Sequence, residues 1–398
     1  MQKILYLTFY FKPDLCAGSF RNSPLLEELA RQAEEKNVAI DVFTTLPNRY
    51  STFSQEAQAI EVQGNVKVER IAIPQHQSGI KDQSFSFKAY YDEVRKRVKH
   101  EQYDMVFASS SRLFTAFLGY SIARSRKIPL YLDIRDIFVD TINEVLKNPM
   151  VKLGAIPFLK FVEKRTFGYA QHINLISAGF KPYFSQYNHA DYSYFSNGID
   201  DVFIEENKKA QAFEPGAGRK KIVYAGNIGE GQGLHKVVPQ AAKLLGDSHE
   251  FHIIGDGGAK KLLKEKIREE GVNNVILRDP IGRSSLIEEY HQADYLFIHL
   301  NDYEAFKKVL PSKIFELAMF NKPLLAGVNG YAREFIQKNL PDSVLFFPGK
   351  AEELVEKLKK LEESPRPKVD RTAFVEKFNR AAINKKMAQS ILNLLPQD

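Results

Sequence analysis

The stretch KIVYAGNIGEGQGL, residues 221–234, joins an apolar strand to a glycine-rich loop. The loop contains Gly226, Gly229, Gly231 and Gly233, and glycine lets backbone amides come close to a phosphate. A helix that follows such a loop points the positive end of its dipole at the same place. The loop lacks the G-x-G-x-x-G register of dinucleotide-binding proteins and the Lys-Ser/Thr pair of a P-loop, which argues against NAD binding and ATP hydrolysis. We expect a diphosphate site here, with a purely conformational turn as the alternative.

A second stretch, LPSKIFELAMFNKPLLAG at residues 310–327, predicts a helix that begins at Pro311 and Ser312. Lys313 falls in its first turn, and Glu316 follows three residues later. A lysine near a phosphate pocket and a carboxylate that accepts two ribose hydroxyls suit a sugar nucleotide. The Ser312 hydroxyl and the first-turn amides are further candidate phosphate ligands. The alternative is a surface ion pair worth only about 0.2–0.5 kcal/mol.

Together the two stretches resemble the donor-binding half of the family 4 retaining glycosyltransferases, which have the GT-B fold. The likeness is to the branch that builds bacterial surface polysaccharides such as O-antigen, capsule and exopolysaccharide. YFKPDLCAGSFRN (10–22) and DIRDIF (133–138) also match that branch, so the resemblance extends over nearly the whole chain. It implies that Glu316 binds the nucleotide ribose and that Lys313 binds the diphosphate.

The resemblance also implies a reaction. A sugar would pass, with retention, from a nucleoside-diphosphate donor (UDP preferred, GDP the second choice) to a lipid-linked acceptor at the inner face of the cell membrane. No cofactor and no metal are expected, because helix ends and cations stabilise the leaving diphosphate in this fold. Two alternatives stay open: a nucleotide-sugar epimerase or hydrolase on the same fold, and a non-catalytic glycosyltransferase-like subunit.

Alternating strands and helices predict the fold class. Apolar β-rich runs recur at 4–10, 39–45, 66–73, 105–110, 130–136 and 172–177, and again at 221–227, 250–256, 274–279, 295–300, 323–328 and 343–348, with amphipathic helical patterns between many of them. This favours an α/β protein of two Rossmann-like, doubly wound parallel-sheet domains facing an interdomain cleft. We expect an acceptor-side domain at 1–200, a nucleotide-sugar domain at 201–370, and a C-terminal helix at 371–398 that crosses back to the first domain.

Two departures from the family pattern concern the reacting sugar. Many members have two glutamates flanking seven residues, and the first of these falls at Lys308. Glu304 lies nearby but has the wrong spacing for the same helix geometry. Relatives often place a histidine after the fourth strand, where this chain has Ser109 to Arg112. These departures weaken the inference about the reaction mechanism more than the inference about the enzyme class.

Asp133, Arg135 and Asp136 follow an apolar strand of the first domain, at the end where α/β proteins bind ligands. We expect them to orient the acceptor or the transferred sugar, with a structural Arg–Asp pair as the alternative. The candidate catalytic residues are Asp133, Arg135, Asp136 and Lys313. The candidate donor-binding residues are Gly18, Gly226, Asn227, Gly229, Gln232, Gly233, Ser312, Lys313 and Glu316.

The roles of single residues are expected as follows. Gly18 would admit the donor phosphates on the first strand-to-helix loop, with Arg21 adding charge. Asn227 would hold the glycine loop or touch the sugar. The nucleotide base would lie near Arg278 or Arg283.

Composition sets the remaining limits. The chain has 398 residues, a net charge of +7 and a single cysteine, Cys16, which excludes a disulfide framework and fits a reducing cytoplasm. The apolar start is soon broken by Lys12 to Asp14 and reads as a buried strand, not as a signal peptide. Basic and aromatic residues at 85–100 and 147–165 suit an anionic membrane surface, with a simply solvated helix surface as the alternative. Nucleic acid is not expected as a partner.

Overall fold

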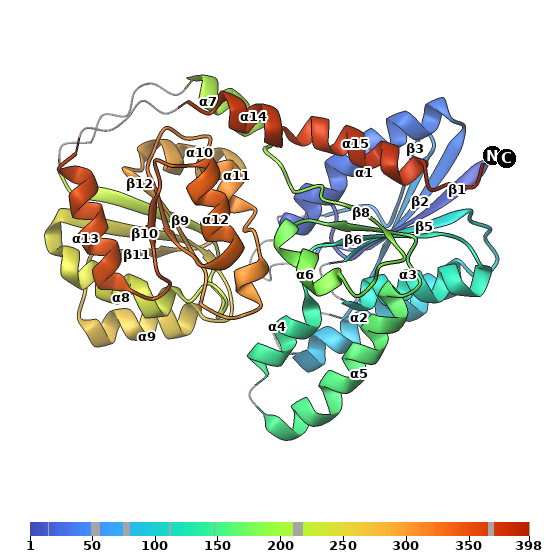
Figure 1. Ribbon diagram of the computed structural model, residues 1–398, viewed down its shortest axis with the longest axis horizontal. Coiled ribbons are helices and arrows are strands. Elements are labelled where there is room, and N and C mark those ends of the chain that lie inside the picture. The colour runs from blue at the N-terminus through green and yellow to red at the C-terminus, as the bar shows by residue number, and fades with distance from the viewer. Residues whose placement is uncertain are drawn as a thin grey trace. The chain divides into compact units, whose positions relative to one another are not determined.

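The computed structural model describes residues 1–14, 16–48, 56–74, 80–110, 113–146, 148–209, 218–364 and 370–397. The chain forms two compact units. Unit 1 comprises Met1–Asn197 and Arg380–Asp398, and unit 2 comprises Gly198–Asn379. Each unit is an α/β structure around one parallel or nearly parallel sheet, which confirms the predicted fold class (Figure 1).

The elements of unit 1 are β1 (Gln2–Thr8), α1 (Ala17–Glu35), β2 (Val38–Thr45), β3 (Ile60–Gln63), β4 (Val66–Ile71), α2 (Ile80–Arg97), β5 (Met105–Ser110), α3 (Leu113–Arg126), β6 (Leu130–Ile134), α4 (Phe138–Val145), α5 (Pro149–Phe167), β7 (His172–Leu175), η1 (Ala178–Phe180), α6 (Lys181–Phe184), β8 (Asp191–Ser193) and α15 (Arg380–Leu392). The eight strands have the order β3-β4-β2-β1-β5-β6-β7-β8. Neighbours are parallel except β3 and β4, which form an antiparallel hairpin.

The elements of unit 2 are α7 (Asp201–Lys209), β9 (Lys220–Asn227), α8 (Leu234–Leu245), η2 (Gly246–Ser248), β10 (His249–Asp256), α9 (Lys260–Glu270), β11 (Val275–Arg278), α10 (Arg283–Gln292), β12 (Tyr295–His299), η3 (Phe306–Lys308), α11 (Lys313–Leu317), β13 (Leu324–Gly327), α12 (Gly330–Asn339), β14 (Val344–Phe346), α13 (Ala351–Glu362) and α14 (Thr372–Phe378). The six strands are all parallel, in the order β11-β10-β9-β12-β13-β14. One core cluster joins α8 and α13 to one face of this sheet, and another joins α10, α11, α12 and α14 to the other face.

The strand order fixes where ligands can bind. In unit 2 the chain proceeds from β9 outward through β10 to β11, then returns to β12 on the other side of β9. In unit 1 the same reversal occurs between β1 and β5. Doubly wound sheets bind ligands at the carboxyl ends of the strands that flank such a reversal. The loops after β9 and β12, and those after β1 and β5, are therefore the expected ligand-binding loops.

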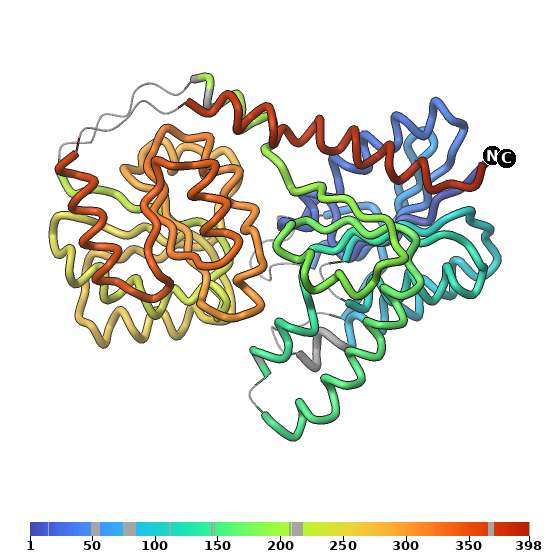
Figure 2. Tube along the Cα trace, viewed as in Figure 1, coloured from blue at the N-terminus to red at the C-terminus, as the bar shows by residue number. Residues whose placement is uncertain are grey.

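The C-terminal segment is divided between the units, rather than crossing as one helix from residue 371. Phe374 and Phe378 of α14 pack against Phe315 and Phe335 in the core of unit 2. After Asn379 the chain enters unit 1, where α15 packs on α1. Figure 2 shows the two ends of the chain side by side in unit 1, where the Gln2 amide donates a hydrogen bond to the Pro396 carbonyl (2.7 Å).

The amphipathic pattern LLEELARQAEE begins at Leu25, but helix α1 begins eight residues earlier, at Ala17, and it contains Pro24. Buried polar contacts explain the early start. Asn22 bonds the hydroxyls of Tyr6 and Thr8, and Arg21 is likewise buried. Gly18, expected in the preceding loop, accordingly lies in the first turn of the helix.

Candidate functional site

The glycine loop lies at the carboxyl end of β9, one of the two strands that flank the reversal in unit 2. It runs from Ile228 to Gly233 and leads directly into the 12-residue helix α8. No side chain caps the start of α8. Its first amides therefore point toward the loop without a partner from the cap residue, as in a phosphate-binding helix terminus.

The packing of this loop explains three of its glycines. A Cβ on Gly229 would lie 2.5 Å from Asn227 Nδ2, and one on Gly231 would lie 2.8 Å from Phe306 Cζ. Gly233 has a φ of +57°, and a Cβ there would lie 2.6 Å from Asn301 Cγ. The glycines are thus required by close approach of the loop to its neighbours and, at Gly233, by a left-handed conformation.

Two predicted donor-binding side chains hold the loop from inside. Asn227 Nδ2 donates a hydrogen bond to Gln232 Oε1 (2.8 Å), and the Gly229 amide donates to the same oxygen (3.2 Å). The hydroxyl of Tyr224 donates to the Asn227 carbonyl (2.6 Å). Of the two roles expected for Asn227, these contacts describe the first, that of holding the loop.

The loop after β12 is bonded to the glycine loop. Asn301 donates from its backbone to the Gly231 carbonyl (2.9 Å) and from its side chain to the Glu230 carbonyl. His299 Nδ1 donates to the Gln232 carbonyl (2.6 Å), while its Nε2 accepts from the Gly349 amide (2.9 Å). We had named neither residue as a candidate. The available signal is that His299 is a polar residue at the carboxyl end of an apolar strand and that Asn301 follows two residues later.

His299 is locked in its neutral form. Burial lowers the pKa of this imidazole to about 4, and the acceptor role of Nε2 requires the unprotonated ring. A histidine with a lowered pKa stabilises the fold fully above its usual value near 6.5, and this stabilisation is lost as the pH falls from 6.5 toward 4. The glycine loop is therefore expected to loosen in mild acid.

We expect a measurable pH dependence from this histidine. Lowering the pH from 6.5 to 5 should reduce the free energy of unfolding by about 2 kcal/mol through His299 alone, at 1.36 kcal/mol per pH unit. His299→Asn keeps an amide donor but cannot titrate, so its stability should depend less on pH. Urea unfolding of both proteins at pH 7.5 and pH 5 measures the difference. Equal pH dependence of the two proteins would show that His299 does not cause it.

The PSKIFE segment follows β12 and brings Lys313 and Glu316 together. Lys313 Nζ lies 2.8 Å from Glu316 Oε2, and the Glu316 side chain is mostly buried, whereas that of Lys313 is about one third exposed (32%). Burial lowers the pKa of Lys313, but the attraction of Glu316 outweighs it, so the pKa of the lysine is raised and it stays charged. The buried hydroxyl of Tyr290 faces the same pair, and burial raises its pKa to about 12. The pair is more buried than the surface ion pair considered as the alternative.

Helix α11 is shorter than expected. It spans only the five residues Lys313–Leu317, and the Ser312 side chain makes no capping hydrogen bond. So short a helix has little dipole, because the macrodipole sums over aligned peptide units. The charge of Lys313 is therefore the main electrostatic contribution of this segment, and phosphate binding by Ser312 and the first-turn amides stays a prediction.

The region of the missing glutamate is basic. Lys308 ends η3, and the alternative carboxylate, Glu304, has an exposed side chain that pairs with Lys307.

The two arginines considered for the nucleotide base form ion pairs: Arg278 pairs with Glu289, and Arg283 pairs with Asp200. Each of these arginines therefore has a carboxylate partner within unit 2.

In unit 1, Asp133 has a structural environment. The side chain is fully buried, and Arg21 donates to both carboxylate oxygens (2.7 and 2.8 Å). Ser109 and Asn174 donate one further hydrogen bond each (2.9 and 2.8 Å). Burial raises the pKa of Asp133, but Arg21 outweighs it and the net pKa is lowered. This geometry supports the structural Arg–Asp pair, with Arg21 rather than Arg135 as the arginine, and Arg21 is not placed to meet a donor phosphate.

Arg135 and Asp136 have different surroundings. The Nε atom of Arg135 is buried without a hydrogen-bond partner among the described residues, and burial lowers the pKa of the guanidinium. A Cβ on Gly18 would lie 3.0 Å from Arg135 Nη1, so the missing side chain makes room for the arginine. Burial raises the pKa of Asp136 to about 6. Ser111 and Arg112, the last two residues of the serine-rich stretch, lie outside the described residues.

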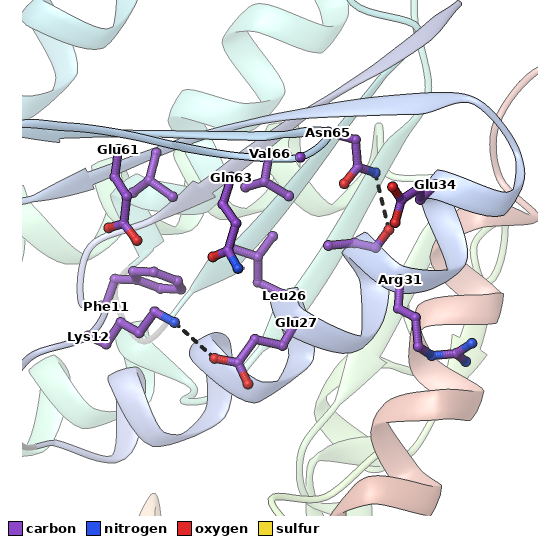
Figure 3. Close-up of a pocket in the computed structure, with 13 residues that line it drawn as sticks. Phe11, Lys12, Leu26, Glu27, Arg31, Glu34, Glu61, Gln63, Asn65 and Val66 are labelled. Atoms are coloured by element: carbon purple, nitrogen blue, oxygen red, sulfur yellow. Dashed lines mark hydrogen bonds and ion pairs between the residues drawn. The ribbon is translucent and has the colours of Figure 1, made fainter.

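A separate groove of about 390 Å³ lies in unit 1 between α1 and the β3–β4 hairpin (Figure 3). Its floor contains Phe11 and Leu26, and Lys12 pairs with Glu27 at its rim (2.9 Å). None of the predicted site residues lines it. Among the described residues, no group of three or more His, Cys, Asp or Glu side chains is arranged to hold a metal ion. No described helix is both long and apolar enough to cross a bilayer.

Comparisons with known proteins agree with this architecture. Residues 205–384 match the family model described as Glycosyl transferases group 1. Sucrose-phosphate synthase (tll1590) from Thermosynechococcus elongatus has a similar structure, with a TM-score of 0.72, 12% identity and 99% of each chain covered. Anabaena Alr3699/HepE in complex with UDP-glucose gives 0.65 at 15% identity, covering 99% of this chain and 100% of the other.

A curated relative matches over a short segment. The putative colanic acid biosynthesis glycosyl transferase WcaI of Escherichia coli (strain K12) is 40% identical over 57 residues, which is 14% of this chain and 14% of that protein. The chain therefore spans only a small part of that relative in the match. These matches define the class: residues 205–384 form a glycosyl transferases group 1 domain, and the chain has the GT-B fold.

Proposed function

We propose that the protein transfers a sugar, with retention, from a UDP-sugar to a lipid-linked acceptor in the synthesis of a bacterial surface polysaccharide. The observation that carries the donor half is the position of two features on adjacent strands. The glycine loop follows β9, the Lys313–Glu316 pair lies in the segment after β12, and the order reverses between these strands. The UDP-glucose complex of the similar Anabaena protein supports UDP as the carrier.

Each group of the donor then has a partner in unit 2. The diphosphate binds the first backbone amides of α8, beside the glycine loop. Glu316 accepts hydrogen bonds from the ribose hydroxyls, which draws it away from Lys313. The freed ammonium neutralises the charge that grows on the diphosphate as the bond to the sugar breaks.

The chemical step follows from the missing carboxylate. With Lys308 at the position of the first family glutamate, no carboxylate is proposed as a covalent nucleophile. The bond between the anomeric carbon and the diphosphate oxygen breaks, and the acceptor hydroxyl attacks from the same face. The acceptor proton passes to the leaving phosphate, so the products are the retained glycoside and the nucleoside diphosphate.

Unit 1 is proposed to serve the acceptor side. The buried Nε of Arg135 is a hydrogen-bond donor without a partner among the described residues, and the guanidinium packs against Gly18. Asp136, with its pKa raised by burial to about 6, is the proposed hydrogen-bond partner for a sugar hydroxyl. The relative matched over 57 residues carries the name of a putative colanic acid biosynthesis glycosyl transferase, which supports a surface polysaccharide as the class of product.

The experiment that tests this function combines binding with product analysis. The whole protein is incubated with UDP-glucose, UDP-galactose, UDP-N-acetylglucosamine, GDP-mannose and NAD, and thermal unfolding is followed. A ligand at a hundred times its dissociation constant stabilises by about 2.7 kcal/mol, so one UDP-sugar should raise the melting temperature by several degrees. The product formed on a polyprenyl-diphosphate-linked sugar is then examined by NMR for the anomeric configuration of the donor. No response to any UDP-sugar, or an inverted product, would contradict the proposal.

A further inference from the structure

Helix α5 exposes an unusual amount of apolar surface. Met150 and Leu153 are 85% and 80% exposed, and Phe158 is 58% exposed. The exposed large apolar side chains of α5 are Met150, Val151, Leu153, Phe158 and Phe161. No residue of the first half of the helix, from 149 to 158, is buried. Figure 1 shows this half extending away from the sheet of unit 1, together with α4.

The exposed apolar residues share one face of the helix. At 100° per residue, positions 150, 153, 157, 158 and 161 fall within one half of the circumference. The opposite half carries Leu159, Val162 and Phe167, which are the buried anchors. The exposed face is therefore a continuous apolar surface with no core to cover, which marks an interaction site.

The charges on this face have one sign. Lys160, Lys164 and Arg165 follow the apolar half and are exposed, and the Arg165 guanidinium lies 5.0 Å from the centre of the Phe161 ring. Glu163, the one acidic residue of α5, is 3% exposed and bonds the Tyr183 hydroxyl on the inner side. An apolar face flanked by lysine and arginine, without exposed carboxylates, complements the interface of an anionic lipid bilayer.

Helix α2, the other basic segment, is less suited to this role. Arg97 pairs with Glu69 and Glu93 (2.9 and 3.0 Å), and Arg95 donates to Ser121 (2.9 Å). Phe85 is its one large apolar side chain that is mostly exposed among the described residues. Basic side chains already tied to acidic or hydroxyl partners contribute less to an external anionic surface.

We propose that α5 lies in the interface of an anionic membrane and inserts its apolar face, from Met150 to Phe161, below the lipid headgroups. The inference rests on the lipid-linked acceptor of the proposed function and gives that acceptor a docking element. Lys160, Lys164 and Arg165 lie at headgroup level. Binding therefore depends on both apolar insertion and anionic lipid, whereas a purely electrostatic contact would depend on charge alone.

The absence of tryptophan from the sequence allows a direct test. Phe158→Trp places a single fluorophore on the proposed face, and Phe85→Trp places one on α2 as the matched control. With vesicles of phosphatidylglycerol and phosphatidylethanolamine, we expect a blue shift and quenching by brominated lipid chains for Phe158→Trp only. A shift at Phe85→Trp alone assigns the contact to α2, and no shift at either position overturns the proposal.

A second set of variants measures the contribution of the apolar face. The triple variant Met150→Ser, Leu153→Ser, Phe158→Ser changes only exposed side chains, so the fold is retained. It should bind these vesicles at least tenfold more weakly than the wild type in sedimentation. The control, Ile60→Ser with Val62→Ser on the exposed side of β3, should bind like the wild type. Equal vesicle binding by all three proteins would contradict insertion of the apolar face into the membrane. If the wild type is a dimer that the triple variant dissociates, the face contacts a second copy of the chain and not a membrane.

The proposed transferase function and the proposed membrane contact of α5 can be contradicted independently. Melting shifts with UDP-sugars report on unit 2 and need no membrane. If the triple variant keeps those shifts and vesicle binding is absent in the wild type, the donor site stands and α5 has another role. If vesicle binding is present but no nucleotide sugar binds, the docking surface stands and the proposed function does not.

Discussion

Replacing Glu316 by alanine should weaken binding of the sugar nucleotide by about 10- to 150-fold, because hydrogen bonds to a charged group contribute about 1.5–3 kcal/mol. The structure adds a second reason. Glu316 is the ion-pair partner of the partly buried Lys313, and its removal leaves that ammonium without a carboxylate. Titration calorimetry with UDP measures the affinity, and turnover with the preferred UDP-sugar measures the rate.

The matched control is Glu205→Ala. Glu205 pairs with Lys208 at the same spacing of three residues (2.6 Å) but on the exposed surface of α7. Its loss should change neither affinity nor turnover, since exposed pairs contribute little. Unchanged donor affinity in Glu316→Ala, with the fold intact, would remove Glu316 from the donor site.

Gly233→Ala should dismantle the glycine loop. A residue with a side chain at a φ of +57° is strained, and the new Cβ would overlap the Asn301 amide that holds the loop. Left-handed strain of about 1–2 kcal/mol and overpacking of about 1–3 kcal/mol together predict a large loss of stability in unit 2. We expect a lower melting temperature and no detectable binding of UDP.

The variant Gly271→Ala separates backbone strain from close packing as causes of the loss. Gly271 ends α9 with a φ of +64°, but no atom lies within 4 Å of its added Cβ. This variant should lose only the stability that backbone strain explains and should keep UDP binding. If both variants lose the same stability and both still bind UDP, close packing of the loop is not needed for the nucleotide.

Local patterns predicted the strands well. Each apolar run expected as a strand overlaps one, including the short β13 and β14, because buried parallel strands are continuous apolar segments. The hairpin strand β3 and the terminal strand β8 were missed. β3 carries only four residues and alternates poorly, so its short pattern could not be separated from a loop.

Contacts between distant residues explain what sequence could not predict. Asp133 bonds Arg21, which is 112 residues away in the sequence, whereas the sequence pattern suggested Arg135, two positions away. Glycines of the loop were recognised, but their packing against Phe306 and Asn301 depends on the return of the chain along β12. The roles of Lys313, Glu316, Arg135 and Asp136 stay predictions until the variants above are measured.

The division of the C-terminal helices has a consequence for synthesis of the chain. Unit 1 is discontinuous: α15, which covers α1, leaves the ribosome only after all of unit 2. A nascent chain that has reached Asn379 contains every element of unit 2, yet the apolar side of α1 still lacks its cover. The chain passes from unit 1 to unit 2 after Asn197 and returns after Asn379. These two connections lie side by side, because the Ile199 amide donates a hydrogen bond to the Phe378 carbonyl (2.7 Å). Unit 2 is thus an insertion in the sequence of unit 1. The half proposed to bind the donor is thus completed first, and the half proposed to serve the acceptor is closed only when α15 (Arg380–Leu392) has been made.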